Sequence, residues 1–275
     1  MQPGIYTSDQ LTSEAYHSSE GISKSGLDLV MRSPAHYRFA DKRESTRAME
    51  IGTALHCAIL EPERFATDYM MLKEVTDRRA SAYKEACKVW SAERVLTGTE
   101  ADKVAGMQES VRSNPHLAEY MQSAGRYELS VFATDPVTGV LVKCRFDKLT
   151  DSGLAVDLKK TQDLRDFGKS VANYGYQIQA AFYSDVYKWA TGEELRGFVF
   201  AAVEENMPHA SAPIFLDEEA LEIGRMQYRE ALNTYAECLS SDDWPGIAVE
   251  PQTIQLPSWY INQFDSVELD WEGVD

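Results

Sequence analysis

The sequence predicts an α/β fold in which helices pack on the faces of a β-sheet. Two observations predict it. Between Tyr127 and Lys160, apolar residues recur with period two in three successive segments, which is the pattern of β-strands. A long helical segment and two more strand-like segments follow, as in folds that layer helices on a sheet. The chain has 275 residues, of which 44% are hydrophobic and 26% charged, an ordinary globular composition.

The amino-terminal part is predicted to be mainly helical. A first helix ends at Ser33-Pro34, because the residue before proline avoids the helical basin, and Glu61-Pro62 ends a second helix. In chain order we expect loop and surface over 1–20, a helix from a cap at Ser23 or Ser25 to about Met31, a helix over 50–60, and charged helical sequence over 77–122.

The rest of the chain carries the predicted sheet. The elements are a hairpin of strands 127–134 and 140–149, a strand over 154–160, a helix over 168–190, strands over 198–204 and 210–216, and a helix from a cap at Asp217 to about Leu239. No repeat or linker interrupts the chain. We therefore expect one domain over 1–275, with a helical part (1–125), a catalytic sheet and helix (126–216), and an acidic helix and tail (217–275).

Cysteine usage and hydropathy favour a reduced protein of the cytoplasm. The cysteines stand singly, so they lack the spacing of a zinc ribbon or an iron–sulfur cluster; they are Cys57, Cys87, Cys144 and Cys238. The longest apolar stretches, 54–60 and 197–203, are far shorter than the ~20 residues of a membrane span, and the amino terminus has no signal pattern. Export and membrane insertion are both disfavoured.

The charge is distributed unevenly. The formal net charge is −17, but residues 201–275 hold 16 acidic residues against two basic ones. Residues 21–48, here called the basic strip, carry six basic and three acidic residues beside three aromatic or histidine side chains. Such a strip can guide a polyanion to one face, and a solvated helix face is the alternative. Its basic residues are Lys24, Arg32, Arg38, Lys42, Arg43 and Arg47.

Two aspartates and a lysine are the candidate chemical centre. Asp157 and Lys159 lie two apart on a predicted strand, so their side chains leave the same face while Leu158 points to the packed side. Asp147, near the end of the preceding strand, can approach Asp157. Two converging carboxylates suit Mg²⁺ or Mn²⁺, and an ion there can polarise a phosphodiester and lower the pKa of bound water. The alternative is a common surface Asp-x-Lys pair.

Other side chains strengthen this interpretation. Lys159 is expected to act electrostatically, with a general-base role as the weaker option. Tyr176, Gln179 and Tyr183 form one helical stripe, so Gln179 is expected to point at a polar site such as phosphate, a base or metal-bound water; an aromatic core stripe is the alternative. His56 lies among apolar neighbours on a helix, which leaves both a core histidine and a ligand open.

With these residues assembled, the chain resembles the PD-(D/E)XK nuclease superfamily, in the branch of RecB-like and RecE-like exonucleases. Within that branch it is most similar to the exonuclease VIII (RecE) nuclease domain of phages and prophages. The motifs that carry the resemblance are Ile22-Ser-Lys-Ser-Gly-Leu27, Ser33-Pro-Ala-His-Tyr37, Ile51-Gly-Thr-Ala-Leu-His56 with Leu60-Glu-Pro-Glu-Arg64, Asp147 with Asp157-x-Lys159, and Tyr176-x-x-Gln179-x-x-x-Tyr183. Phe146 stands where the family pattern has proline, a variation that this branch tolerates.

The resemblance implies a central mixed β-sheet flanked by helices, and a role for each site residue. His56, Asp147 and Asp157 would bind the divalent metal together with the Leu158 carbonyl. Lys159 would be the catalytic lysine, and Gln179 and Tyr183 would belong to the helix motif of RecB-type nucleases. The iron–sulfur cysteines of some relatives are missing, which leaves a hard-metal site for Mg²⁺, with Mn²⁺ as a substitute.

The resemblance also implies an activity and partners. Relatives degrade linear double-stranded DNA from its 5′ ends and leave 3′ overhangs for a RecT-like annealing protein. They form rings, here a trimer or tetramer, whose channel the basic strip could line through Lys24, Arg32, Arg38 and Arg43. The expected setting is the cytoplasm of a bacterial host, with the gene carried by a phage or prophage.

Two other functions stay open, and several residues stay secondary candidates. A structure-specific or restriction-like endonuclease would use the same fold. A catalytically silent adaptor that binds DNA ends is the other alternative, although such a protein would not need like charges held together.

Arg145 is expected on the other strand face from Asp147, as a structural ion pair or a phosphate contact. Carboxylates that support the metal ligands without touching the metal could come from Glu61, Glu63 and Glu128. No partner pattern is evident for His17, His36, His116 and His209.

Overall fold

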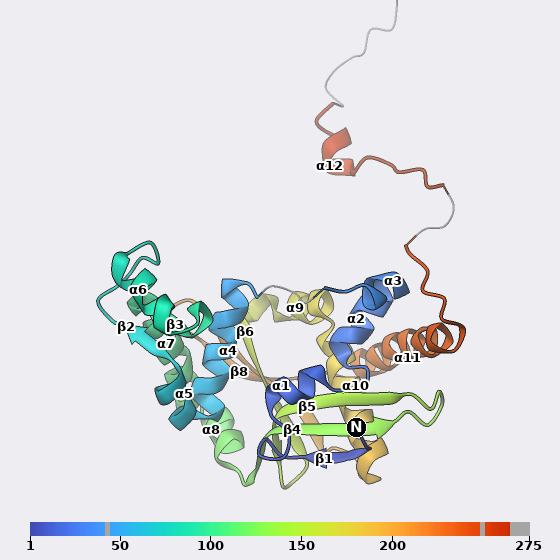
Figure 1. Ribbon diagram of the computed structural model, residues 1–275, viewed down its shortest axis with the longest axis horizontal. Coiled ribbons are helices and arrows are strands. Elements are labelled where there is room, and N and C mark those ends of the chain that lie inside the picture. The colour runs from blue at the N-terminus through green and yellow to red at the C-terminus, as the bar shows by residue number, and fades with distance from the viewer. Residues whose placement is uncertain (42–44, 248–250, 265–275) are drawn as a thin grey trace, which may run out of the picture.

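A six-stranded mixed β-sheet forms the centre of the molecule (Figure 1). The computed structural model describes residues 1–41, 45–247 and 251–264. The strand order is β1-β4-β5-β6-β7-β8, in which β6 and β7 are parallel and the other neighbours antiparallel. The strands are β1 (Gly4–Tyr6), β4 (Gly125–Thr134), β5 (Leu141–Thr150), β6 (Leu154–Thr161), β7 (Gly197–Glu204) and β8 (Ser211–Phe215).

Helices cover both faces of this sheet, which confirms the predicted fold class. Strand β7 shows the division: Phe198, Phe200 and Ala202 enter one hydrophobic core, and the alternate residues Val199, Ala201 and Val203 enter the other. The first core is covered by α2 (Lys24–Arg32), α10 (Tyr176–Thr191) and α11 (Glu218–Ser241), and the second by α4 (Arg47–Leu60), α7 (Gly98–Ser113) and α8 (Pro115–Gln122).

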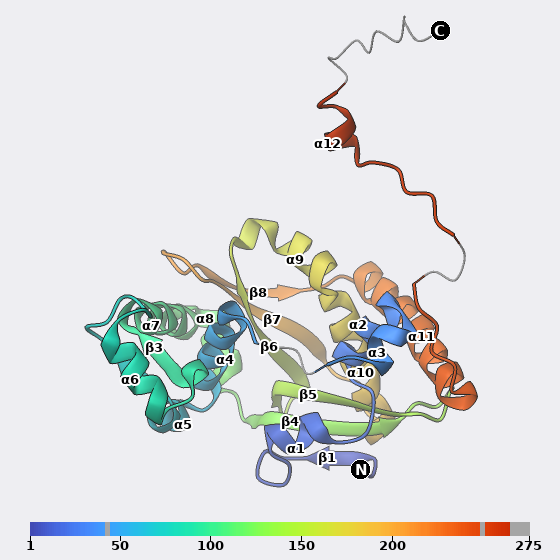
Figure 2. The same ribbon diagram turned by 45° about the horizontal axis from the view of Figure 1, so that its top comes forward.

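Shorter elements complete the fold. β2 (Met70–Leu72) and β3 (Val95–Thr97) pair in parallel as a small second sheet. The short helices are α1 (Ser13–Ser18), α3 (Pro34–Arg38), α5 (Pro62–Asp68), α6 (Ser81–Val89), α9 (Phe167–Tyr174) and α12 (Ser258–Ile261). α12 projects away from the sheet (Figure 2). Within the described ranges, none of the helices combines the length and apolar character that crossing a membrane requires.

The expectation that the first 20 residues are only loop and surface is wrong. β1 extends the sheet by pairing with β4, and α1 buries Tyr16 against Phe132, with ring centroids 6.0 Å apart. These elements have three and six residues, so no hydrophobic period develops in them.

Two predicted helical stretches are interrupted. The expected helix over 168–190 is two helices, because Gly175 lies between them with φ +63°, a left-handed conformation that ends α9. The stretch 77–122 is divided into three helices: a short 3-10 turn and β3 separate α6 from α7, and Asn114 before Pro115 separates α7 from α8. β3 is fully buried and pairs with β2, so a tertiary contact decides its conformation.

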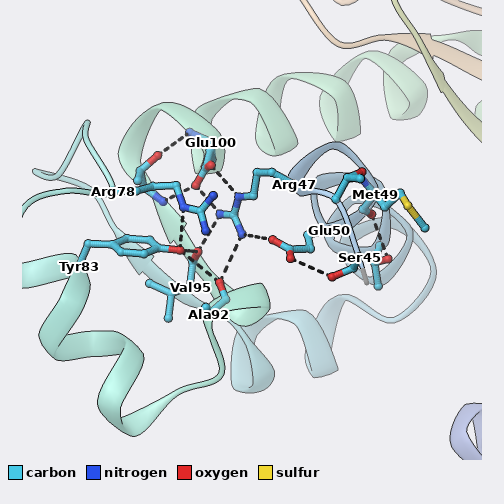
Figure 3. A network of polar contacts seen from close by, with 12 residues as sticks. Ser45, Arg47, Met49, Glu50, Arg78, Tyr83, Ala92, Val95 and Glu100 are labelled. Atoms are coloured by element: carbon cyan, nitrogen blue, oxygen red, sulfur yellow. Dashed lines mark hydrogen bonds and ion pairs between the residues drawn. The ribbon is translucent and has the colours of Figure 1, made fainter. Parts of the chain in front are cut away.

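A partly buried ion-pair network holds the first turn of α4 (Figure 3). The Arg47 guanidinium contacts Glu50 at 2.8 Å and Glu100 at 2.5 Å, and donates to the carbonyls of Ala92 and Val95. We call this set the Arg47 network. It corrects the assignment of Arg47 to a DNA-guiding strip, because the guanidinium is already paired inside the protein.

Candidate active site

The candidate site lies where strands β5 and β6 separate. Their ladder consists of two residue pairs, Lys148 with Val156 and Leu149 with Ala155. Farther along, side chains satisfy the backbone of Leu158: its N–H donates to Asp147 Oδ2 at 2.8 Å, and its carbonyl is 3.0 Å from His56 Nε2. A buried strand backbone must find such partners once the ladder ends. The separation therefore brings α4, β5 and β6 together at one point.

His56 and Asp147 form the first half of the site. His56 Nδ1 is 3.3 Å from Asp147 Oδ2, while Nε2 faces a carbonyl oxygen, so both ring nitrogens point at acceptors. Burial lowers the pKa of His56, but the Asp147 carboxylate outweighs it and raises that pKa above its usual value. Burial likewise raises the pKa of Asp147, and the His56 and Lys159 charges with the Leu158 N–H lower it overall.

Asp157 and Lys159 form the second half, and they share one face of β6 as their spacing predicts. Asp157 is 4% exposed; its Oδ1 accepts from Gln179 Nε2 at 2.6 Å. Its Oδ2 is in ion-pair contact with Lys159 Nζ but has no partner in hydrogen-bond geometry. Burial raises the pKa of the Asp157 carboxyl, and this outweighs the opposing Lys159 charge.

Lys159 is held as a cation. Its ammonium lies 5.0 Å from the centroid of the Tyr176 ring and 5.8 Å from that of Phe200. Burial lowers the pKa of this ammonium, but the carboxylates of Asp157 and Asp147 raise it above the usual value. Because a charged ammonium cannot accept a proton, this environment favours the electrostatic role over the general-base role.

The site opens into a cleft of about 650 Å³. His56, Asp147, Lys159 and Tyr183 line it, and α1 contributes a wall through Ser13 and His17. The sequence prediction missed this wall because it treated the first 20 residues as surface. The cleft is large enough for a nucleotide-sized ligand next to the paired charges.

Glu128 is a site residue that the sequence prediction left among the secondary candidates. It interrupts β4 with φ +50°, a strained conformation for a residue with a side chain, and no ladder pair joins it to β5. Its carboxylate is 2.7 Å from Arg145 Nε and lines the cleft. Burial raises the pKa of Glu128, and the nearby Asp147 charge adds to the effect. Only tertiary structure reveals this third acid, because one strained residue inside a strand in unchanged register leaves no periodic signal.

Arg145 corrects a further expectation. It lies on the same side of β5 as Asp147, since residues two apart on a strand share a face, and both line the cleft. Its guanidinium pairs with Glu128 and donates to Ser130 Oγ at 2.7 Å and to the Leu11 carbonyl. The structural ion pair expected for Arg145 is therefore present, at a place that also faces the cleft.

The residues predicted to bind DNA lie in different surroundings. Lys24 lines the cleft and is bonded to Asp28 at 2.8 Å and to the Tyr174 carbonyl at 2.5 Å. Arg32 is exposed on α2, and Arg38 is exposed at the end of α3, 6.0 Å from the Trp244 ring. Arg43 and Lys42 lie outside the described residues.

The secondary candidates mostly have other partners. Glu61 pairs with Arg64 at 3.0 Å, and Glu63 is exposed. Among the remaining histidines, His36 contacts Ser33 Oγ at 2.6 Å and the buried His209 contacts the Glu204 carbonyl. His116 is exposed, and His17 borders the cleft.

The donor chemistry of the site fits a hard divalent cation. Within the described ranges, no three His, Cys, Asp or Glu side chains already stand in a metal-ligating arrangement. In the present arrangement the Lys159 ammonium and the His56 ring take up oxygens of Asp157 and Asp147. Asp157 Oδ2 is buried and its contact is the Lys159 ammonium, so this carboxylate oxygen is held beside a cation, the kind of partner that a divalent metal ion would also supply.

A mixed sheet whose separated strands bring an Asp-x-Lys pair beside a second aspartate defines a PD-(D/E)XK-like domain. Residues 23–256 match the family model described as a PDDEXK-like domain of unknown function (DUF3799), and the chain belongs to that family. The predicted superfamily and fold class are thereby confirmed. Nucleases of this class typically use divalent metal ions, and the family and fold together support a nuclease.

Solved structures agree with the fold. The crystal structure of a candidate exonuclease from Eubacterium rectale is similar, with 16% sequence identity, a TM-score of 0.63, and coverage of 94% of this chain and 99% of that chain. At that identity the likeness shows the fold alone. A second structure, of SSO0001, has 10% identity and a TM-score of 0.27 over 75% of this chain and 86% of that chain, too low to carry an argument. No curated protein matches the sequence significantly.

Proposed function

We propose that this protein is a Mg²⁺-dependent exodeoxyribonuclease that degrades linear double-stranded DNA from 5′ to 3′ and leaves 3′ single-stranded overhangs. One observation carries the proposal. Asp147 and Lys159 line one cleft, where Asp147 accepts from the Leu158 N–H and the Lys159 ammonium contacts the buried Asp157, in a chain of the PDDEXK-like family. The choice of Mg²⁺, the 5′ to 3′ direction and the 3′ overhangs rest on the resemblance of the motifs to RecE-type exonucleases.

Each residue has a definable role in this proposal. Asp147, Asp157, His56 and the Leu158 carbonyl would hold the metal ion. When bound, the ion supplies Lewis-acid activation of a phosphodiester and of water. The Gln179 amide fixes Asp157 in one orientation through its Oδ1 atom. The Lys159 ammonium, already charged, stabilises negative charge that develops on the phosphate oxygens.

The same resemblance supports proposed partners. DNA ends would enter the cleft beside Lys24, and the exposed Arg32 and Arg38 would contact phosphates outside it. A RecT-like annealing protein would receive the overhang, and several copies of the chain would form a trimeric or tetrameric ring. We place the protein in the cytoplasm of a bacterial host, encoded by a phage or prophage.

Digestion of end-labelled linear duplexes tests substrate, metal and direction together. With Mg²⁺, the 5′ label should be released before the 3′ label, and removal of the metal with EDTA should stop release. Lys159→Ala should lower the cleavage rate at least about a hundredfold, because it removes the charge that stabilises the reacting phosphate. Its binding to the same DNA without metal should persist.

Covalently closed circular DNA is the matched control substrate. An exonuclease leaves it intact, whereas cutting of the circle at a rate similar to the linear duplex would favour the restriction-like endonuclease. Binding of DNA ends without any cleavage under Mg²⁺ or Mn²⁺ would favour the silent adaptor. Substantial activity in Lys159→Ala would contradict the role given to this residue.

A further inference from the structure

An exposed tyrosine stands at the turn between α9 and α10. Tyr174, the last residue of α9, is 63% exposed, and Gly175 follows it in a left-handed conformation. Single exposed aromatic side chains are ordinary on protein surfaces. Tyr174 differs from the ordinary case because one side of its ring is already stacked inside the protein.

A row of rings connects Tyr174 with the candidate catalytic lysine. Tyr174 stacks on Tyr176 with centroids 5.7 Å apart and an interplanar angle of 30°, and Tyr176 stacks on Phe200 at 5.4 Å and 29°. The Lys159 ammonium lies over the Tyr176 ring at 5.0 Å. Tyr174 is therefore one ring away from the ring that contacts the site, and its orientation is fixed from the inside.

The Tyr174 backbone is bonded to a residue that lines the cleft. Its carbonyl accepts from Lys24 Nζ at 2.5 Å, and Lys24 lines the cleft together with Lys159. The fit is close, because a Cβ atom at Gly175 would lie 3.3 Å from Lys24 Nζ. The Lys24 ammonium thus holds the backbone of Tyr174, and the Lys159 ammonium lies over Tyr176, the ring on which Tyr174 stacks.

We propose that Tyr174 is a stacking platform for a nucleobase of the DNA strand in the cleft, an inference that rests on the proposed function. Proteins that hold single strands combine cations for the backbone with aromatic rings for the bases, and every base offers a π-face. In a duplex both faces of an internal base are covered by its neighbours. The base on Tyr174 therefore belongs to a strand that has separated from its complement beside the cleft.

Binding of short single-stranded DNA in EDTA tests this without cleavage. The probes are fluorescent oligothymidylates of one length, with or without a single abasic position that is moved along the strand, and fluorescence anisotropy gives the Kd. Tyr174→Ala should bind the intact strand about five- to tenfold more weakly, the low end of the effect of losing a stacked base. Tyr174→Phe should bind as wild type, because it keeps the ring.

The abasic series identifies the contact. One abasic position should weaken binding by the same factor in wild type and Tyr174→Phe, and should have no effect in Tyr174→Ala, as expected for two groups that contact each other. Phe215→Ala, which removes an exposed ring from the edge strand β8, should bind as wild type.

The outcomes separate this inference from the proposed function. Equal affinity of Tyr174→Ala and wild type, or a Tyr174→Phe defect as large as that of Tyr174→Ala, would overturn the stacking platform even if the wild type degrades linear DNA. The stacking platform is supported if one abasic position weakens DNA binding by the wild type and by Tyr174→Phe but not by Tyr174→Ala. The same result in a protein that never cleaves DNA would reject the nuclease and keep the platform.

Discussion

Helix α4 carries a charged cluster at each end, and the two clusters differ in how well their charges are paired. At its first turn, burial raises the pKa values of Glu50 and Glu100, but Arg47 outweighs burial and lowers both. Near its other end, His56 faces Asp147 and Asp157, and burial keeps the pKa of Asp157 raised despite Lys159. We call His56, Asp147, Asp157, Lys159 and Gln179 the cleft cluster.

The difference separates a structural role from a functional one. In the Arg47 network, one guanidinium contacts two carboxylates and two carbonyls, so the carboxylates are stabilised as charged groups. In the cleft cluster, the negative charge of Asp147 adds to burial in raising the pKa of Asp157, and the Lys159 ammonium that contacts Asp157 does not outweigh them. Like charges held together cost stability, and such a cost is typical of sites that bind a ligand.

The largest effect should come from Asp157→Asn, with opposite results for activity and stability. The raised pKa means that at neutral pH the Asp157 charge is less favourable in the folded than in the unfolded chain. The asparagine amide lacks that charge, so cleavage should fall at least about a hundredfold. Its oxygen still accepts from Gln179, so the free energy of unfolding should not decrease. Urea denaturation beside the end-label assay measures both.

Arg47→Met should behave in the opposite way. It leaves two mostly buried carboxylates without their cation, since Glu50 and Glu100 are only 15% and 17% exposed. We expect a loss of about 3 kcal/mol in the free energy of unfolding, with unchanged cleavage per folded molecule. The control is Lys188→Met, which breaks an exposed pair with Glu194 and should cost less than about 1 kcal/mol. A cleavage defect in folded Arg47→Met would remove the distinction between the two clusters.

The sequence predicted those parts of the cleft cluster that obey a period. Asp157 and Lys159 share a strand face by period two, and Gln179 reaches Asp157 from a helix whose stripe was recognised. The separation of β5 and β6 and the missing ladder pair at Glu128, where φ is positive, could not be predicted, because they are departures from a regular ladder. The Arg47 network joins α4 to residues about fifty positions later, which local pattern does not encode.

A smaller effect concerns the pKa of His56 in metal-free protein. The Asp147 carboxylate holds this pKa above its usual value, so Asp147→Asn should lower it, because burial and the Lys159 charge then oppose only the weaker effect of Asp157. A raised folded pKa gives stability that is complete below the unfolded value of about 6.5 and is lost as pH rises through the folded pKa. The free energy of unfolding of Asp147→Asn should therefore not show this decrease as pH rises. NMR titration in EDTA, with His56→Gln to assign the signal, measures the pKa; an unchanged value would contradict the pairing.

The smallest effect is expected at Arg38, outside both clusters. Arg38 is exposed at the end of α3, and among the described residues its guanidinium lies over the Trp244 ring, 6.0 Å from the centroid. If it contacts a DNA phosphate, Arg38→Ala should weaken binding to linear duplex and make the dependence of log Kd on log salt shallower by about one phosphate, or about 0.9 in slope. Because no base is read through this contact, the loss should be equal for duplexes of different sequence. An unchanged slope would remove Arg38 from the DNA path and restrict the proposed contacts to the cleft.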